Sequence, residues 1–515
     1  MTEALIFHSL CICRDTERAP IINRLPGEVL LEIFDSYRQN IIDKYDHYWR
    51  KKYAWFNLAH VCRKWRAVML ASFSRLDLNV VVGPVKPSNI KTILSGHLPI
   101  LIDYLHSYGP RENNGSAVWR MRAALGHRDR VRSISFQGHS DDFKKFIKAT
   151  NYHFPALESL VLCFPEGYEP EIPATFLRGS DRSDLPVRRL GLYGGSIAFF
   201  VSGILSSATA LTDLTLKITT SNFVNLDLLQ GSSLIACLQG MQRLRKLDLT
   251  TQLNLRVLLP ESEQSPDPKD TTATVPMSEL TRFYYSGPNR FLNHLMSRIS
   301  APSLQDARFQ VRARCSLPYF SRVIDDVREK FRSISVTFDS DNFHFVSSTH
   351  LGEIDHFKPS ESSFRLNVTC SPYSIGSMNS TPSTKLSIAE ELTLNFPSSN
   401  MTGWEDIFST RMRDFLRQFR SVRVLRVNPF VREIGLYLKQ DEDGQEAIFP
   451  VLEEVEISIS RRRFTEGIFD PDGEYQRGAA EAVAVFEPCE RAGRIVKVYL
   501  CKQTEMQSRN ARSRY

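Results

Sequence analysis

The sequence has no apolar run that could cross a membrane and no long block of charge of one sign. No stretch reaches the roughly 18 consecutive apolar residues that a spanning helix needs, so we expect no membrane segment. Lys and Arg number 65 against 58 Asp and Glu, which leaves a formal net charge of +7 over 515 residues. So small a positive charge does not favour nucleic acid as a partner.

Cysteine is scarce. The nine cysteines are odd in number and lie mostly inside apolar runs, as buried reduced thiols do. Cys11 and Cys13 are separated by one residue, and no later Cys or His pair completes a tetrahedral metal site. The apolar stretch near the N-terminus lacks a basic segment before it and a small-residue cleavage site after it, so it predicts no signal peptide. We therefore expect a reducing compartment, either the cytoplasm or the nucleus.

Recognisable catalytic motifs are also missing. The Gly-rich GLYGGS at 191–196 could hold a phosphate, but it has neither the third spaced glycine of a dinucleotide site nor the Gly-Lys-Ser/Thr of a P-loop. His344, His350 and His356 are spaced by six, which suits no metal-ligand pattern on a helix or strand. The three arginines at 461–463 are typical of a solvated rim, with a contact to an acidic ligand as the alternative. We expect no catalytic residue, no metal and no cofactor.

What is present is the composition of a folded soluble protein, with 42% hydrophobic and 24% charged residues. The chain is long enough for roughly three domains unless it forms a repeat array.

Helical periodicity is clearest near the N-terminus. Pro26 suits the first position of a helix. A polar and aromatic connector is predicted over 37–53 and a second helix over 54–72. Two such helices can cover each other's apolar faces. The face of the first consists of Val29, Leu30, Ile33 and Phe34, and that of the second of Trp55, Leu58, Cys62, Trp65 and Met69.

The rest of the chain repeats a six-residue pattern, apolar-x-x-apolar-x-apolar. Each copy predicts a short strand whose last two apolar residues point inward. Helices are predicted between several copies, over 140–150, 196–207, 231–241, 289–300 and 404–419. This alternation of strand and helix implies parallel strands. Five clear copies begin at residues 131, 157, 187, 211 and 244, and weaker copies begin at 280, 304, 331, 389, 422 and 452.

Three segments interrupt the repeated pattern. Residues 259–276 are rich in Pro, Ser and acidic side chains, which predicts a loop, and residues 439–446 predict a short acidic loop. The spacing breaks over 338–384, where we expect extra strands rather than a full repeat. A helix and a final strand are predicted over 475–500 as a C-terminal cap.

The motif LPGEVLLEIF at 25–34, followed by LAHVCRKWRAV at 58–68, resembles an F-box. The connector is longer than in the shortest F-boxes, and the end of the segment lacks a tryptophan often found there. The resemblance covers residues 21–80 and implies a three-helix module that docks on a Skp-type adaptor and, through it, a cullin scaffold. The adaptor-binding residues that it implies are Leu25, Pro26, Leu30, Ile33, Phe34, Val61, Cys62 and Trp65.

The repeated strands resemble irregular leucine-rich repeats, although the usual Asn or Cys after the strand is mostly missing. The whole chain is similar to the large group of fungal F-box proteins with degenerate leucine-rich repeats. The implied fold is α/β, a three-helix F-box followed by an irregular leucine-rich-repeat solenoid with a curved parallel sheet and outer helices. The implied parts are a flexible N-terminus (1–20), the F-box (21–80), the solenoid (81–500, with insertions at about 259–276 and 338–384) and a basic tail (501–515).

The resemblance implies a non-catalytic substrate-recognition subunit of a Skp-cullin-F-box ubiquitin ligase, whose repeats bind a target protein that the sequence does not identify. The alternative is a repeat-based protein-interaction module unconnected to ubiquitin, in which the N-terminal helices only cap the repeats. Two further hypotheses stay open. Steep salt dependence of affinity for generic DNA or RNA would indicate a nucleic-acid binder, and stabilisation of the fold by a nucleotide or metal would indicate an enzyme.

Overall fold

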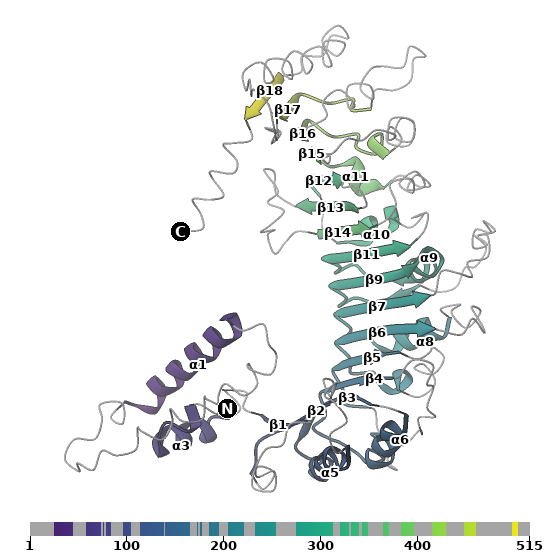
Figure 1. Ribbon diagram of the computed structural model, residues 1–515. Coiled ribbons are helices and arrows are strands. Elements are labelled where there is room, and N and C mark those ends of the chain that lie inside the picture. Colours follow the sequence, from purple (N-terminus) through teal and green to yellow (C-terminus); the bar gives the residue numbers. More distant parts are fainter. Residues whose placement is uncertain are drawn as a thin grey trace, which may run out of the picture. The chain divides into compact units, whose positions relative to one another are not determined.

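The protein is a mixed α/β structure with a large, mainly parallel sheet, as seen in a computed structural model (Figure 1). The chain divides into two compact units. Unit 1 comprises Met1–Phe136 and His153–Leu157, and unit 2 comprises Gln137–Tyr152 and Glu158–Tyr515. The structure describes residues 25–44, 58–73, 76, 79–83, 96–104, 114–138, 140–164, 173, 176–177, 185–194, 204–220, 232–253, 274–312, 320–328, 331–338, 342–348, 364–369, 383–395, 415–428, 448–459 and 497–502.

Unit 1 begins with the helix α1 (Gly27–Lys44). It starts one residue later than predicted, because the Pro26 carbonyl accepts the N–H of Leu30 and Pro26 itself lies just outside the helix. The predicted connector was wrong in its first part, since α1 continues through residues 37–44. Helix propensity is sufficient there, because the segment contains neither Gly nor Pro.

The single helix predicted over 54–72 is interrupted at Cys62. Residues 58–59 are helical, a turn follows, and α3 (Arg63–Ala71) then begins. Cys62 has an extended backbone, and its Sγ accepts the N–H of Trp65 at 3.4 Å. A side chain that caps the first turn in this way starts a new helix. The apolar spacing of residues 54–72 continues through Cys62, and for this reason the sequence did not reveal the break between the two helices.

Among the other described residues of unit 1 are three parallel strands, which pair in sequence order, and a helix that lies against the first two strands. The strands are β1 (Val80–Val82), β2 (Ile100–Tyr104) and β3 (Val131–Gln137), and the helix is α5 (Asn114–Leu125).

Every copy of the six-residue pattern forms a strand, which confirms the prediction. The first copy is β3 of unit 1, and the other ten lie in unit 2. Those ten are β4 (Ser159–Cys163), β5 (Arg189–Tyr193), β6 (Asp213–Thr220), β7 (Lys246–Leu253), β9 (Arg282–Pro288), β11 (Asp306–Arg312), β12 (Ser333–Phe338), β15 (Glu391–Asn395), β16 (Val424–Asn428) and β17 (Glu454–Ile459).

Two short strands of unit 2, β8 (Val275–Pro276) and β10 (Ile299–Ser300), pair with each other in a separate parallel sheet. The strands that unit 2 contributes to the large sheet follow sequence order except at one insertion. The order is β4-β5-β6-β7-β9-β11-β14-β13-β12-β15-β16-β17-β18. The strands β13 (Asn342–Ser348) and β14 (Phe364–Thr369) confirm the extra strands predicted over 338–384. They lie between β11 and β12, and β13 is antiparallel to both of its neighbours, whereas the other pairs are parallel. The predicted final strand is β18 (Lys497–Lys502), which pairs with β17.

The core of unit 2 consists of ladders of inward-pointing side chains. In β6, Leu214 and Leu216 are fully buried, while Thr215 between them is partly exposed. Leu214 is in register with Leu190 of β5 and Leu247 of β7, so equivalent apolar residues stack across neighbouring strands. This is the inward direction that the last two apolar positions predict.

Helices connect several of the parallel strands and lie beside them in Figure 1. Three of the predicted helices are present, α6 (Ser140–Ala149), α8 (Ser232–Gly240) and α9 (Asn289–Arg298), together with the shorter α10 (Phe320–Asp326) and α11 (Thr384–Ser387). The helices predicted over 196–207 and 404–419 lie largely outside the described residues, as do the loops predicted over 259–276 and 439–446 and the tail predicted over 501–515. The first of these loops was wrong at its end, because residues 275–276 form β8.

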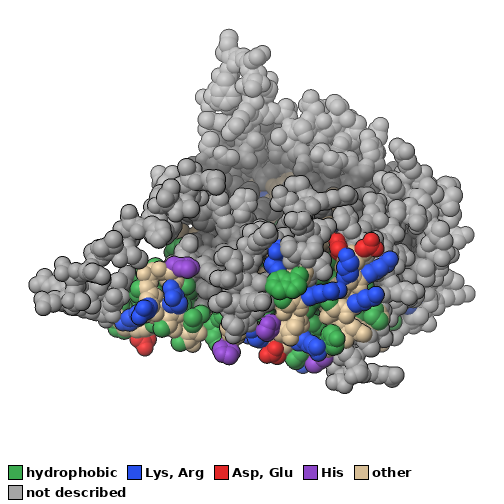
Figure 2. All heavy atoms as spheres, turned by 60° about the horizontal axis from the view of Figure 1, so that its bottom comes forward, with side chains coloured by type: hydrophobic (Ala, Val, Ile, Leu, Met, Phe, Trp, Pro, Cys, Tyr) green, Lys and Arg blue, Asp and Glu red, His purple; other side chains and the backbone are tan. Residues whose placement is uncertain are grey.

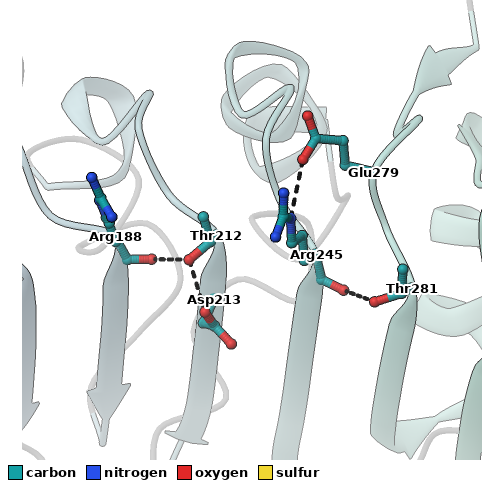
Figure 3. Close-up of polar contacts among 6 residues, drawn as sticks. All are labelled: Arg188, Thr212, Asp213, Arg245, Glu279 and Thr281. Carbon is teal, nitrogen blue, oxygen red and sulfur yellow. Dashed lines mark hydrogen bonds and ion pairs between the residues drawn. The ribbon is translucent and has the colours of Figure 1, made fainter.

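The same pair of hydrogen bonds recurs at the start of successive strands. One backbone carbonyl accepts the N–H groups of two consecutive residues, an arrangement that we call a fork. The Arg188 carbonyl accepts the N–H groups of Thr212 (2.8 Å) and Asp213 (3.0 Å). The Arg245 carbonyl accepts those of Thr281 and Arg282 in the same way, and a hydroxyl bond from Thr281 reinforces this fork (Figure 3). Equivalent forks are centred on the carbonyls of Glu158, Thr212, Thr281, Arg332, Glu390 and Arg423. Each fork aligns one strand with the next and so fixes which face of each strand is buried.

The alanine variant of Gly287 should destabilise unit 2 by about 1–3 kcal/mol. Gly287 is buried at the end of β9, and a Cβ there would overlap Thr251 Oγ1 and lie 2.7 Å from the Tyr285 hydroxyl oxygen. Urea unfolding of the full chain measures the loss. The matched control is Gly240→Ala at the end of α8, where a Cβ has open space and stability should be unchanged or slightly higher. Equal stability of the two variants would contradict the expected overlap.

Candidate functional site

The helices α1 and α3 form a small apolar core of their own in unit 1. Phe34 and Trp65 pack edge to face with ring centroids 4.9 Å apart, and Leu30 and Met69 are fully buried beside them. Trp65 is buried although its Nε1 has no hydrogen-bond partner among the described residues. The burial of these side chains stabilises α3 against α1, because a helix of nine residues such as α3 is marginal alone.

This core leaves part of the apolar face of α1 uncovered. Val29 and Ile33, four residues apart on the helix, have exposed fractions of 42% and 38%, while the adjacent Leu30 and Phe34 are buried. Val61, in the turn before α3, is 53% exposed, and Leu70 near its end is 43% exposed. Of the eight large hydrophobic residues that are exposed in the described part of the chain, these are four. We call Pro26, Val29, Ile33, Val61 and Leu70 the exposed apolar set.

The eight sequence-predicted adaptor-binding residues therefore divide into three groups. Leu30, Phe34 and Trp65 lie inside the core, so they support the module and have little surface to offer a partner. Leu25 and Cys62 are partly buried against that core. Pro26, Ile33 and Val61 are exposed. Val29 and Leu70 were not predicted as site residues, although Val29 shared the predicted apolar face.

Charged side chains flank these apolar ones, acidic on α1 (Glu28 and Glu32) and basic on α3. The helix α3 contains Arg63, Lys64 and Arg66 and no acidic residue. Lys64 donates to the Leu25 carbonyl at 2.8 Å, and Arg66 donates to the Ala59 carbonyl at 2.9 Å, so both side chains also tie the module together. In the space-filling view, the smaller coloured area, at the left, shows hydrophobic side chains beside positively charged ones (Figure 2). Apolar anchors with a charged rim are typical of a protein-binding surface.

The second candidate region is the polar face of the strands in unit 2, opposite the buried ladders. Lys217 lies over the ring of Tyr193, with its Nζ 5.3 Å from the ring centroid. Burial raises the pKa of the Cys163 thiol to about 11, so this thiol is protonated and a weak nucleophile at neutral pH. Burial also raises the pKa of Tyr193. Both pKa values are raised because the two side chains are partly buried, and a raised pKa makes neither the thiol nor the phenol more reactive at neutral pH.

Asp248 is the most unusual residue of this face. Its Oδ1 is buried and has no hydrogen-bond partner in the part of the chain that the structure describes. Burial raises the pKa of Asp248, while the charges of Lys217 and Lys246 and a hydrogen bond with Thr250 oppose the increase. A buried carboxylate oxygen without a hydrogen bond lowers the stability of the fold, because it has lost its hydration and gained no donor in return.

The variant Asp248→Asn should be more stable than the parent at neutral pH. The pKa of Asp248 is about 3.8 in the unfolded protein and higher in the folded one. The protonated carboxyl group therefore stabilises the fold below pH 3.8, and this contribution is lost as the pH rises through the folded pKa. Asn does not ionise, so the variant should gain at most about 2 °C in melting temperature at pH 7. Melting curves of both proteins from pH 3 to pH 7 measure the difference. A difference that grows towards low pH would contradict the assignment.

The remaining predicted features have structural explanations or lie outside the described residues. In GLYGGS, Gly194 has a φ of 79°, and a Cβ there would overlap the Phe164 carbonyl oxygen, so the backbone requires glycine. The N-terminal cysteines at 11 and 13, the histidines at 350 and 356 and the arginines at 461–463 lie outside the described residues. Within the described residues, no three His, Cys, Asp or Glu side chains are grouped as metal ligands, and no helix is long and apolar enough to cross a membrane.

Comparison with models of known protein families and with curated protein sequences gave no match to this chain.

Proposed function

We propose that this protein is the substrate-recognition subunit of a Skp-cullin-F-box ubiquitin ligase. In this proposal α1 and α3 belong to an F-box that docks on a Skp-type adaptor, and the parallel strands of unit 2 form an irregular leucine-rich-repeat solenoid that holds a target protein. The observation that carries the proposal is the exposed apolar set. Half of the exposed large hydrophobic residues of the described chain lie on one small helical module, in the two segments that resemble an F-box.

The repeated geometry of unit 2 supports the solenoid. Equivalent apolar side chains stack from strand to strand, and the same forked hydrogen bond recurs at successive strand entries. Such an array buries its apolar positions between neighbouring repeats and leaves a long polar strand face available for binding. The β13–β14 insertion makes the array irregular.

The protein itself would catalyse no reaction. It would hold a target near the ubiquitin-conjugating enzyme that the cullin scaffold carries, so that a target lysine and the activated ubiquitin react at a high effective concentration. Affinity for the adaptor would come from apolar anchors on α1 and before α3, with the basic side chains of α3 at the rim.

The direct test is isothermal titration of the full chain with a purified Skp-type adaptor. We expect a saturable one-to-one complex. If no complex forms at micromolar concentrations, the proposal is wrong and the chain is a repeat-based protein-interaction module whose N-terminal helices only cap the repeats. Variants of Leu30 or Trp65 are unsuitable as interface probes, since both side chains are buried and their removal would unfold the module.

A further inference from the structure

Leu98 connects the helical module of α1 and α3 to the first strands of unit 1. Its side chain packs against the core that the two helices form, and β2 begins two residues later at Ile100. Leu76, a buried member of the same core, lies shortly before β1, which begins at Val80. The core of the helical module is therefore attached to two neighbouring strands, through Leu76 before β1 and through Leu98 before β2.

The Leu98 carbonyl is held by Arg130, the residue directly before β3. The Arg130 guanidinium donates to that oxygen twice, from Nε at 3.0 Å and from Nη2 at 2.7 Å. In return, the Arg130 carbonyl accepts the N–H of Ile100 at 2.8 Å. The Pro99 carbonyl accepts the N–H of Val80 at 2.7 Å, so the segment that carries Leu98 is fixed to the strand on either side of it.

These contacts favour a rigid connection over a flexible tether. Two charge-assisted hydrogen bonds from one planar guanidinium fix both the distance and the direction of the Leu98 carbonyl. Burial lowers the pKa of Arg130, and the charge of Asp129 opposes the decrease, so the guanidinium is partly withdrawn from water. Both hydrogen bonds are stronger for this reason, because water competes less for a partly buried donor.

We propose that Arg130 is a positioning residue, which holds the helical module in one orientation to β1, β2 and β3 through the Leu98 carbonyl. The inference deepens the proposed function and rests on it for its biological role. An adaptor docked on the exposed apolar set would keep one orientation to these strands. The ubiquitin-conjugating enzyme would then sample fewer positions, which raises the effective concentration of activated ubiquitin at a target lysine within its reach.

The test measures the distance between α1 and α5 in the full chain by double electron–electron resonance. Spin labels are attached to non-canonical amino acids at the exposed positions Ser36 and Arg122, so that the nine cysteines stay unmodified. The second label reports on the strands, because α5 lies against β1 and β2. We expect one narrow distance distribution in the parent and a distribution at least about twofold broader in Arg130→Ala. A broad distribution in the parent, or equal widths in the two proteins, would overturn the inference.

Two further variants separate positioning from a general loss of stability. Arg130→Lys keeps the positive charge but lacks the planar fork, so its distribution should be intermediate in width. Arg128→Ala removes an exposed arginine two residues earlier and should keep the parent's width. Equal broadening in Arg128→Ala would overturn the assignment to Arg130. Should Arg130→Ala fail to fold by circular dichroism, Arg130→Lys decides, and the parent's width in that variant would overturn the inference.

Titration with the purified adaptor separates this test from that of the proposed function. Arg130→Ala should bind the adaptor within about twofold of the parent, because the exposed apolar set is unchanged. A loss of about tenfold or more would show that Arg130 supports the docking surface itself, and would overturn the positioning role. If the parent binds no adaptor, the proposed function is wrong, whereas the distance measurement still decides whether Arg130 fixes the helical module.

Discussion

The double variant Ile33→Glu with Val61→Glu should lose affinity for the Skp-type adaptor by at least about 100-fold. Each substitution would place a carboxylate where the proposed interface buries an apolar anchor, and the cost of desolvating an unpaired charge adds to the lost contact. Ile33 and Val61 are 38% and 53% exposed, so the change should leave the core of α1 and α3 intact. Titration with the purified adaptor measures the loss, and circular dichroism checks the fold.

The matched control for that experiment is the double variant Ile388→Glu with Val451→Glu. Both residues lie in unit 2 and have exposed fractions of 43% and 47%, close to those of Ile33 and Val61. This control should bind the adaptor like the parent. Full affinity in the Ile33 and Val61 variant would remove the exposed apolar set from the interface, and an equal loss in both variants would indicate a non-specific effect of charge.

The largest effect on stability is expected for Trp65→Ala, which should destabilise the helical module by about 3–5 kcal/mol. Trp65 is 6% exposed and packs on Phe34, so alanine would leave a cavity at the centre of a core with few other members. Because the chain has two compact units, we expect the loss to be local to this module. Hydrogen exchange of peptides covering α1 and α3 measures it, with unchanged protection of the unit 2 strands as the internal reference.

The variant Trp65→Phe separates the packing of the ring from its polar group. It keeps an aromatic ring against Phe34 and removes the Nε1–H, which is buried without a partner in the parent. We expect a loss below about 1.5 kcal/mol, because the smaller ring volume is offset by removal of an unsatisfied donor. A loss as large as that of Trp65→Ala would show that the Nε1–H makes a stabilising interaction.

Most of the strands could be predicted because their signal is local. In LTDLTL at 211–216, the spacing of Leu211, Leu214 and Leu216 requires a strand with a preceding turn, and all three side chains are fully buried. The third position of each copy predicts an exposed side chain, and Arg189, Lys246 and Arg282 occupy it in their copies. That these three side chains lie on nearby strands was not recognised from the sequence, because they are 57 and 36 positions apart and only the register brings them together.

The insertion shows the limit of local signals in unit 2. The broken spacing after residue 338 predicted extra strands, but nothing local indicated that β14 would pair with β11 and so separate β11 from β12. Strand pairing depends on which edge is available when the sheet forms, and this is a property of the assembled fold.

By itself, the sequence determined the helical character of the N-terminal segment and the strand positions of the repeats, because periodicity acts within a few residues. Only the tertiary structure decided which apolar side chains of α1 form core and which remain exposed. Val29, Leu30, Ile33 and Phe34 share one broad apolar face, but α3 is a short helix of nine residues that begins only at Arg63. It therefore covers Leu30 and Phe34 and leaves Val29 and Ile33 available to a partner.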